Sequence, residues 1–150
     1  MERINQVQEL LAGITTRFEQ PEAGRVDAYI QSPWQLPEGT RSLLAIGFLL
    51  TAITGMDLPQ TNEYEGGTEL LYHFSSGPII ATMRFRVTYG DPVAPTICDI
   101  IPMATLYERE VMEMYGVILE GTPDRSRLLL SDDWPDGVYP MRKSFKGLES

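Results

Sequence analysis

The sequence predicts an α+β fold: a mostly antiparallel sheet with helices packed on one face, followed by an extended C-terminal tail. The strand patterns succeed one another across short turns, which favours antiparallel pairing. Segments with helical apolar periodicity precede the first strand, separate the first strand from the second and follow the last strand. Beyond Gly116, turn signatures replace long periodic segments. We therefore divide the chain into an α+β domain over residues 1–116 and a partner-binding tail over residues 117–150.

Two helices are expected in the first third of the chain. The first covers residues 2–18, and Pro37 suits the first turn of a second helix over residues 38–49. One face of the first helix carries the apolar residues Ile4, Val7, Leu10, Leu11 and Ile14.

The strands are expected at residues 25–31, 49–56, 68–74 and 79–88, with a short extended piece at 95–100. Alternation of apolar and polar side chains identifies most of them. Ser75-Ser76-Gly77 makes a tight reversal between the last two, so these form the clearest hairpin in the chain.

A charged helix is predicted over residues 103–115, ending at Gly116. At about 100° per residue, its inward face should carry Met103, Tyr107, Val111 and Met114. Glu110 falls at the margin of that face and is expected to be half-buried. Because an unpaired buried charge is expensive, Glu110 should pair with an arginine of the tail, Arg127 or Arg142.

The other carboxylates of this helix point elsewhere. Glu108 and Glu113 lie on different faces, and Arg109 can reach Glu113 at i,i+4. General acid–base catalysis needs two groups that face one substrate, so an active site here is disfavoured. A di-iron carboxylate site is disfavoured further, since no Glu-x-x-His occurs.

Composition narrows the function classes. The net charge of −9 makes general affinity for nucleic acid or an anionic membrane improbable. No apolar run approaches the about 20 residues of a transmembrane helix, and the N-terminus lacks a signal-peptide layout, which favours a cytoplasmic chain. One cysteine and one histidine exclude an iron–sulfur cluster or a Cys/His zinc site from this chain alone. We expect Cys98 to be a buried structural thiol and His73 a surface or packing residue.

The tail is too short to bury a core of its own. It holds one short apolar run, Leu128-Leu129-Leu130, and is rich in Leu, Trp, Tyr and Arg, which favour interfaces. We expect it to lie along its own sheet and along a partner chain. Trp134 suits an interface or a core anchor equally, and Arg142 with Lys143 suits a partner-facing role better than a solvated pair.

Five spaced motifs in the last third form a composite signature: residues 107–110, 114–117, 121–127, 132–134 and 139–145. Together they resemble the 30-kilodalton subunit family of the complex I peripheral arm. That family includes the equivalent subunits of energy-converting membrane-bound nickel–iron hydrogenases. The resemblance is close over residues 101–146, and the preceding order of elements is compatible with it.

Several positions depart from the family pattern. Tyr107 stands where the family often has Trp, Thr122 where it has His, and Ser144 where it has an acidic residue. Residues 125–127 read Arg-Ser-Arg in place of Leu-Arg-Arg, and the long extension of many respiratory members is absent. These departures favour a hydrogenase or another compact complex I-like assembly over an NADH–quinone oxidoreductase, which stays the alternative.

The resemblance implies a subunit without a redox cofactor, peripheral on the cytoplasmic face and held at the membrane only through its complex. Its expected partners are the large subunit, with the nickel–iron site or the quinone pocket, and a neighbouring iron–sulfur subunit; no nucleic acid is expected. A stand-alone binding domain or enzyme is a further alternative, and it would keep its tail protected, whereas a subunit should expose apolar surface there. The residues expected to serve partner binding or tail structure are Glu108, Arg109, Glu110, Glu113, Arg125, Arg127, Trp134, Tyr139, Arg142 and Lys143.

Overall fold

The computed structural model describes residues 2–148, and within that span the chain forms two sheets, three α-helices and two short 3-10 helices. In chain order the elements are α1 (Glu2–Leu11), η1 (Ala12–Ile14), β1 (Thr15–Glu19), β2 (Arg25–Ile30), η2 (Pro33–Gln35), α2 (Leu36–Ala45), β3 (Leu49–Leu58), β4 (Gly67–Ser76), β5 (Ile79–Thr88), β6 (Val93–Pro95), α3 (Ala104–Tyr115) and β7 (Ile118–Glu120). None of these helices is long and apolar enough to cross a membrane.

The main sheet has five strands in the order β1-β2-β5-β4-β3. Every neighbouring pair is antiparallel except β2 and β5, which run parallel. The predicted hairpin is β4–β5, and its two-residue loop places Gly77 at φ +57°, a conformation that suits glycine. The α+β class with a mostly antiparallel sheet is confirmed.

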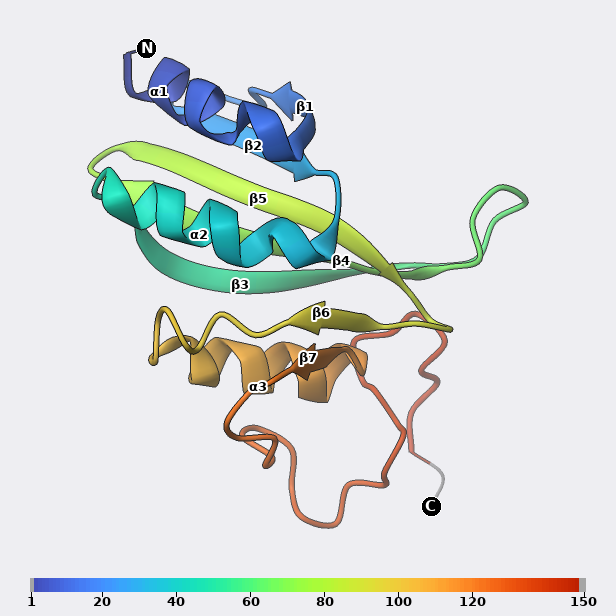
Figure 1. Ribbon diagram of the computed structural model, residues 1–150. Helices are drawn as coiled ribbons and strands as arrows, with labels where there is room; N and C mark the ends of the chain where they lie inside the picture. Colours follow the sequence, from blue (N-terminus) through green and yellow to red (C-terminus); the bar gives the residue numbers. More distant parts are fainter. Residues whose placement is uncertain (1, 149–150) are drawn as a thin grey trace.

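One face of the sheet carries the hydrophobic core. Side chains of β4 and β5 alternate, so Tyr72 pairs with Met83 and Leu70 with Phe85 on the covered side. The helices α1 and α2 lie along this sheet (Figure 1). A Cβ at Gly39 would collide with the sulfur of Met83, so α2 contacts the sheet at close range. The helical residues fully buried here are Val7, Leu36, Leu43 and their neighbours Ile4 and Leu11.

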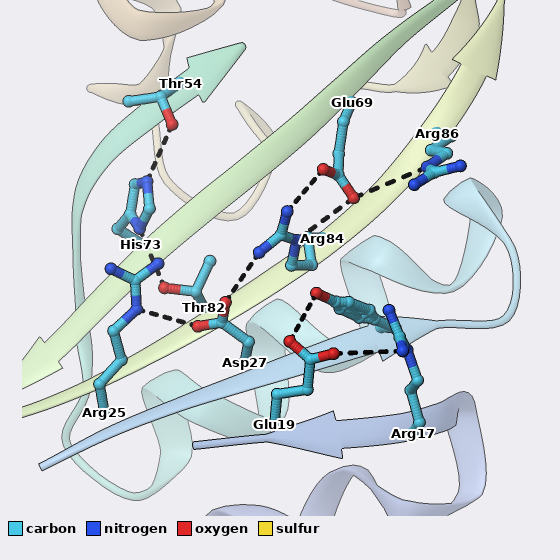
Figure 2. A network of polar contacts seen from close by, with 11 residues as sticks. Arg17, Glu19, Arg25, Asp27, Thr54, Glu69, His73, Thr82, Arg84 and Arg86 are labelled. Carbon is cyan, nitrogen blue, oxygen red and sulfur yellow. Dashed lines mark hydrogen bonds and ion pairs between the residues drawn. The ribbon is translucent and has the colours of Figure 1, made fainter. Parts of the chain in front are cut away.

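The opposite face of the sheet is polar, and its charged side chains bind one another. Figure 2 shows Arg84 between Asp27 and Glu69, with Nη1 2.9 Å from Asp27 and Nη2 2.5 Å from Glu69. Arg25 also binds Asp27 at 2.9 Å, and Arg86 approaches Glu69 at 3.9 Å. Asp27 and Glu69 are only 2% and 5% exposed. Such buried carboxylates are tolerated because each is paired and hydrogen-bonded.

His73 belongs to the same face. Its Nδ1 lies 2.9 Å from the hydroxyl of Thr82, and its Nε2 lies 2.9 Å from the hydroxyl of Thr54 (Figure 2). Burial and the nearby Arg25 lower the pKa of His73 below its usual value. The single histidine is therefore a half-buried packing residue of the sheet.

The C-terminal half adds a further layer. β6 and β7 pair in parallel, and Ala94, Ile97 and Leu119 join the same core as the sheet residues. Figure 1 shows α3 beside them, with residues 121–148, which we call the C-terminal segment, continuing beyond α3. Tyr115 packs its ring on Gly55 of β3, where a Cβ would collide with it, and its hydroxyl donates to the Gly55 carbonyl at 2.7 Å. This contact fixes α3 against the edge strand of the main sheet.

Several predicted boundaries were wrong. The first helix ends at Leu11, and residues 15–19 form β1, because β-branched Thr15 and Thr16 favour a strand that pairs with β2. The second helix begins at Leu36 and ends at Ala45, two residues before Gly47 with φ +89°. The three residues of β7 were also missed, since so short a strand has no pattern of its own.

Candidate functional site: the layer of α3 and the C-terminal segment

The inward face of α3 differs from the prediction. The buried residues are Ala104, Glu108, Val111 and Tyr115. Met103, expected inside, is 74% exposed, while Tyr107 and Met114 are only partly buried at the side. The helix is rotated so that a carboxylate, which apolar periodicity places outside, lies in the interior.

Glu108 is the buried carboxylate of this helix, at 0% exposure. Its two oxygens accept hydrogen bonds from the Thr96 hydroxyl at 2.7 and 2.9 Å, the Ile97 amide at 2.9 Å and the Cys98 thiol at 3.3 Å. Burial raises the pKa of the Cys98 thiol, which keeps its proton available for donation. Glu108 therefore ties the loop after β6 to α3, and Cys98 is buried as predicted.

Glu110, expected to be half-buried and paired, is exposed. The predicted pairing with a tail arginine is wrong, because both candidates bind elsewhere. Arg127 donates to the Ser131 carbonyl at 2.6 Å and to Asp136 at 2.9 Å. Arg142 donates to the Tyr115 carbonyl at 2.8 Å. Across residues 2–148, Glu110 takes part in no ion pair.

Arg109 and Glu113 do not bind each other. Both bind the main chain of the C-terminal segment. Arg109 donates to the carbonyls of Ser126 and Arg127 at 3.0 and 2.8 Å and lies 3.7 Å from Asp124. Glu113 accepts the amides of Leu128, Leu129 and Leu130 at 3.1, 2.9 and 3.1 Å. The two side chains thus hold consecutive carbonyls and amides, and we call Arg109 and Glu113 the α3 clamp.

A second set of contacts holds the end of the segment near the C-terminus of α3. The amide of Met141 donates to the Met114 carbonyl at 3.0 Å, and the amide of Lys143 donates to Asp57 at 2.7 Å. The hydroxyl of Tyr89 donates to the other oxygen of Asp57. Burial and this hydrogen bond raise the pKa of Tyr89 to about 12. Asp57 was not singled out from the sequence, because nothing in a strand-ending aspartate indicates a partner 86 residues away.

Aromatic contacts order the rest of the segment. Tyr139 packs on Gly116, where a Cβ would lie 2.5 Å from the ring, and Gly116 has φ +78° at the end of α3. The Arg142 guanidinium stacks on two rings, with its Cζ 4.6 Å from the ring centroid of Tyr139 and 4.8 Å from that of Tyr89. The indole Nε1 of Trp134 donates to the Val138 carbonyl at 2.7 Å, and its ring packs against that of Phe145 with the centroids 5.7 Å apart. Trp134 is therefore an anchor within the segment.

The same layer leaves apolar side chains in solvent. Those of the C-terminal segment are Leu128, Leu129, Met141 and Leu148, and those of α3 and β7 are Met103, Leu106 and Ile118. Arg125 and the Lys143 side chain are exposed among them. Exposed apolar groups gathered on one layer are typical of interaction sites.

This layer contains two pockets. One, of about 300 Å³, lies inside the loop of the C-terminal segment and is lined by both members of the α3 clamp, Arg125, Trp134 and Tyr139 among others. The other, of about 310 Å³, lies between β3 and α3 and is mostly apolar. No group of three His, Cys, Asp or Glu side chains suited to a metal ion occurs in residues 2–148.

The family model for the respiratory-chain NADH dehydrogenase 30 Kd subunit matches residues 34–150, a span that contains α3, the clamp and the whole C-terminal segment. The chain belongs to this family. The resemblance stated from the sequence motifs is confirmed.

Individual relatives include hydrogenase and quinone-linked proteins. The membrane-bound hydrogenase subunit beta of Pyrococcus furiosus is 50% identical over 79 residues, which are 53% of this chain and 46% of that protein. An NADH-quinone oxidoreductase protein of Bacteroides thetaiotaomicron is 37% identical over 102 residues, covering 63% of this chain and 19% of that protein. The matched region is thus less than half the length of either relative.

A solved structure shares the fold over nearly the whole chain. It is a chain of the membrane-bound sulfane sulfur reductase, an archaeal respiratory membrane complex. The two superpose with a TM-score of 0.81 at 28% identity, covering 98% of this chain and 85% of the other.

Proposed function

We propose that this chain is a peripheral subunit of a complex I-like redox assembly of the energy-converting hydrogenase type. It carries no redox cofactor of its own and docks on the large catalytic subunit through its C-terminal segment. Electron transfer belongs to neighbouring subunits, whose iron–sulfur clusters and nickel–iron site, or quinone pocket, this chain helps to position. Family membership supports this placement.

The α3 clamp carries the proposal. It binds the backbone of residues 126–130, so the side chains of Leu128 and Leu129 are free to point outward, and Leu129 is 60% exposed. A segment that is fixed by its main chain and presents its leucines to solvent is prepared for a partner. Preorganisation of this kind lowers the entropy lost on docking.

A hydrogenase-type partner is preferred to a quinone reductase. The hydrogenase relative is 50% identical, against 37% for the quinone-linked one. The departures at Tyr107, Thr122 and Ser144 point the same way. The 30-kilodalton subunit of an NADH–quinone oxidoreductase stays the second candidate, because relatives from such enzymes also match this chain. We place the chain on the cytoplasmic face of the membrane, held there through its partners.

Co-purification tests the proposal. The tagged chain is co-expressed with the large subunit of the assembly from the same organism, and the recovered large subunit is measured. The double variant Arg109→Ala/Glu113→Ala should lower recovery several-fold, because it releases residues 126–130. Arg86→Ala, on the open sheet face and 57% exposed, is the matched control and should leave recovery unchanged.

Two outcomes would contradict the proposal. One is recovery of the wild-type chain alone, without a large subunit, from native membranes as well as from co-expression; that result would support a stand-alone domain. The other is full recovery with the double variant. Thermal melting of both variants in isolation separates lost docking from lost folding.

A further inference from the structure

The side of α3 next to the clamp forms a second surface that the folded chain leaves open. Met103, Leu106, Glu110 and Met114 are spaced i, i+3, i+7 and i+11, so they lie along one side of the helix. We call these four residues the outer stripe. Met103 and Leu106 are 74% and 47% exposed. The sequence pattern assigns Met103 and Met114 to the core, whereas the fold leaves Met103 at the surface and Met114 only partly buried.

The outer stripe leads into the groove between β3 and α3. The groove is lined by Ile53, Thr54, Gly55, Glu110, Val111, Met114, Tyr115 and Met141. Its volume of about 310 Å³ lies at the lower end of ligand pockets, ~300–1,000 Å³, which suits one or two side chains better than a cofactor. Glu110 is the one charged residue of the lining.

The floor of the groove is fixed. The Tyr115 ring rests on Gly55, and its hydroxyl is bonded to the Gly55 carbonyl at 2.7 Å. The walls are Met114 and Met141, whose flexible thioether side chains adapt to an inserted group. A groove with a rigid floor and adaptable walls requires little rearrangement to accept a side chain.

Glu110 defines the chemistry of the occupant. Its carboxylate is exposed at the groove and has no ion-pair or hydrogen-bonding partner among the interactions of residues 2–148. An apolar segment laid along the outer stripe would bury this carboxylate, and a buried carboxylate needs a compensating cation. Arginine and lysine combine a long apolar stem with a cationic head, so the stem fits between the methionines while the head reaches Glu110.

We propose that the groove between β3 and α3 receives a cationic side chain, arginine by preference, from an apolar segment of the large subunit, with Glu110 as its counter-charge. This inference rests on the proposed function and names a second contact beside the one made by the C-terminal segment. Arginine is preferred because its guanidinium can bind both oxygens of Glu110. Met141 borders the groove and belongs to the C-terminal segment, so the two contacts form one continuous surface.

Binding of the full chain to the purified large subunit tests the proposal. Glu110→Gln should weaken the affinity about tenfold, and Glu110→Lys at least about a hundredfold, as expected when a buried charge loses its partner or meets a like charge. Glu9→Lys, an exposed glutamate of α1, is the matched control and should bind as the wild type does. Both positions are exposed, so the variants should fold, and their melting temperatures check this.

Photo-crosslinking identifies the occupant. A benzoylphenylalanine at Leu106, within the outer stripe, should crosslink to a segment of the large subunit that contains Arg or Lys. Exchange of that basic residue for Glu should restore binding to the Glu110→Lys variant. The proposal is overturned if both Glu110 variants bind like the wild type, or if the crosslinked segment carries no basic residue. Failure of the wild-type chain to bind at all would instead overturn the proposed function.

Discussion

The two outer surfaces of this molecule use their charged residues in opposite ways. On the open face of the sheet, charges bind charges: Arg84 lies between Asp27 and Glu69, and Arg25 completes the set. On the layer of α3 and the C-terminal segment, the charges of the helix bind main chain: Arg109 holds carbonyls and Glu113 holds amides. The first surface satisfies itself within the sheet. The second uses its charges to present apolar side chains.

This difference indicates where a partner belongs. A sheet face whose ions are mutually paired gains little from a partner, because docking would have to desolvate groups that are already satisfied. A segment with exposed leucines and methionines gains from burial, at roughly 25 cal/mol per Å² of apolar surface. The open face should therefore determine the stability of the chain, and the α3 layer should determine its assembly.

The largest expected effect concerns the open face. Arg84→Met removes the cation shared by two buried carboxylates and should lower the free energy of unfolding by about 3 kcal/mol. Chemical denaturation of the isolated chain measures it. Arg17→Met, in a pair whose side chains are 62% and 43% exposed, is the control and should change stability by less than about 1 kcal/mol. Equal effects of the two substitutions would remove the distinction between buried and exposed pairs on this face.

A smaller, local effect is expected in the α3 layer. Glu113→Gln weakens the acceptor of three amides, so hydrogen exchange at Leu128–Leu130 should accelerate about tenfold, equivalent to ~1.4 kcal/mol, while β4 and β5 exchange as before. Glu110→Gln on the same helix is the control and should leave these amides unchanged. If hydrogen exchange accelerated uniformly throughout the chain, the clamp would stabilise the whole fold and not only residues 128–130.

The smallest effect is the pH dependence of the open face. The pKa of His73 is lowered in the folded state, so the unfolded chain binds its proton more readily. Stability should be complete above the unfolded pKa and fall as pH drops from about 7 toward 5. His73→Gln should flatten that part of the profile. Because the chain has one histidine, NMR titration reads its pKa directly, and a pKa above 6.5 would reverse the expected sign.

The sequence predicted what local patterns encode. The hairpin β4–β5 followed from alternation and Gly77, and the end of α3 followed from Gly116. The face of α3 was mispredicted because Glu108 is buried by donors from residues 96–98, and no apolar pattern reports such donors. The strand β1 was missed because Ile14 continues the periodicity of α1 up to the strand.

The candidate site was only partly accessible from sequence. The composite motif singled out Arg109 and Glu110, and the charged helix singled out Glu113, but their partners follow from three-dimensional packing. The three amides held by Glu113 carry no side-chain signal. Two further contacts can likewise be identified only in the folded structure. Tyr139 packs on Gly116, and the amide of Lys143 donates to Asp57.

Oxidative footprinting of methionines compares the two surfaces in one experiment. Met103 and Met141 belong to the α3 layer and are 74% and 53% exposed. Met56 is 45% exposed and pairs across the strands with Glu69, which places it on the open face. Mild peroxide treatment converts exposed methionines to sulfoxides, and mass spectrometry reads each site in the free chain and in the assembled complex. We predict strong protection of Met103 and Met141 on assembly, with Met56 oxidised as before. Protection of Met56 with Met103 and Met141 still reactive would contradict this assignment of the partner surface.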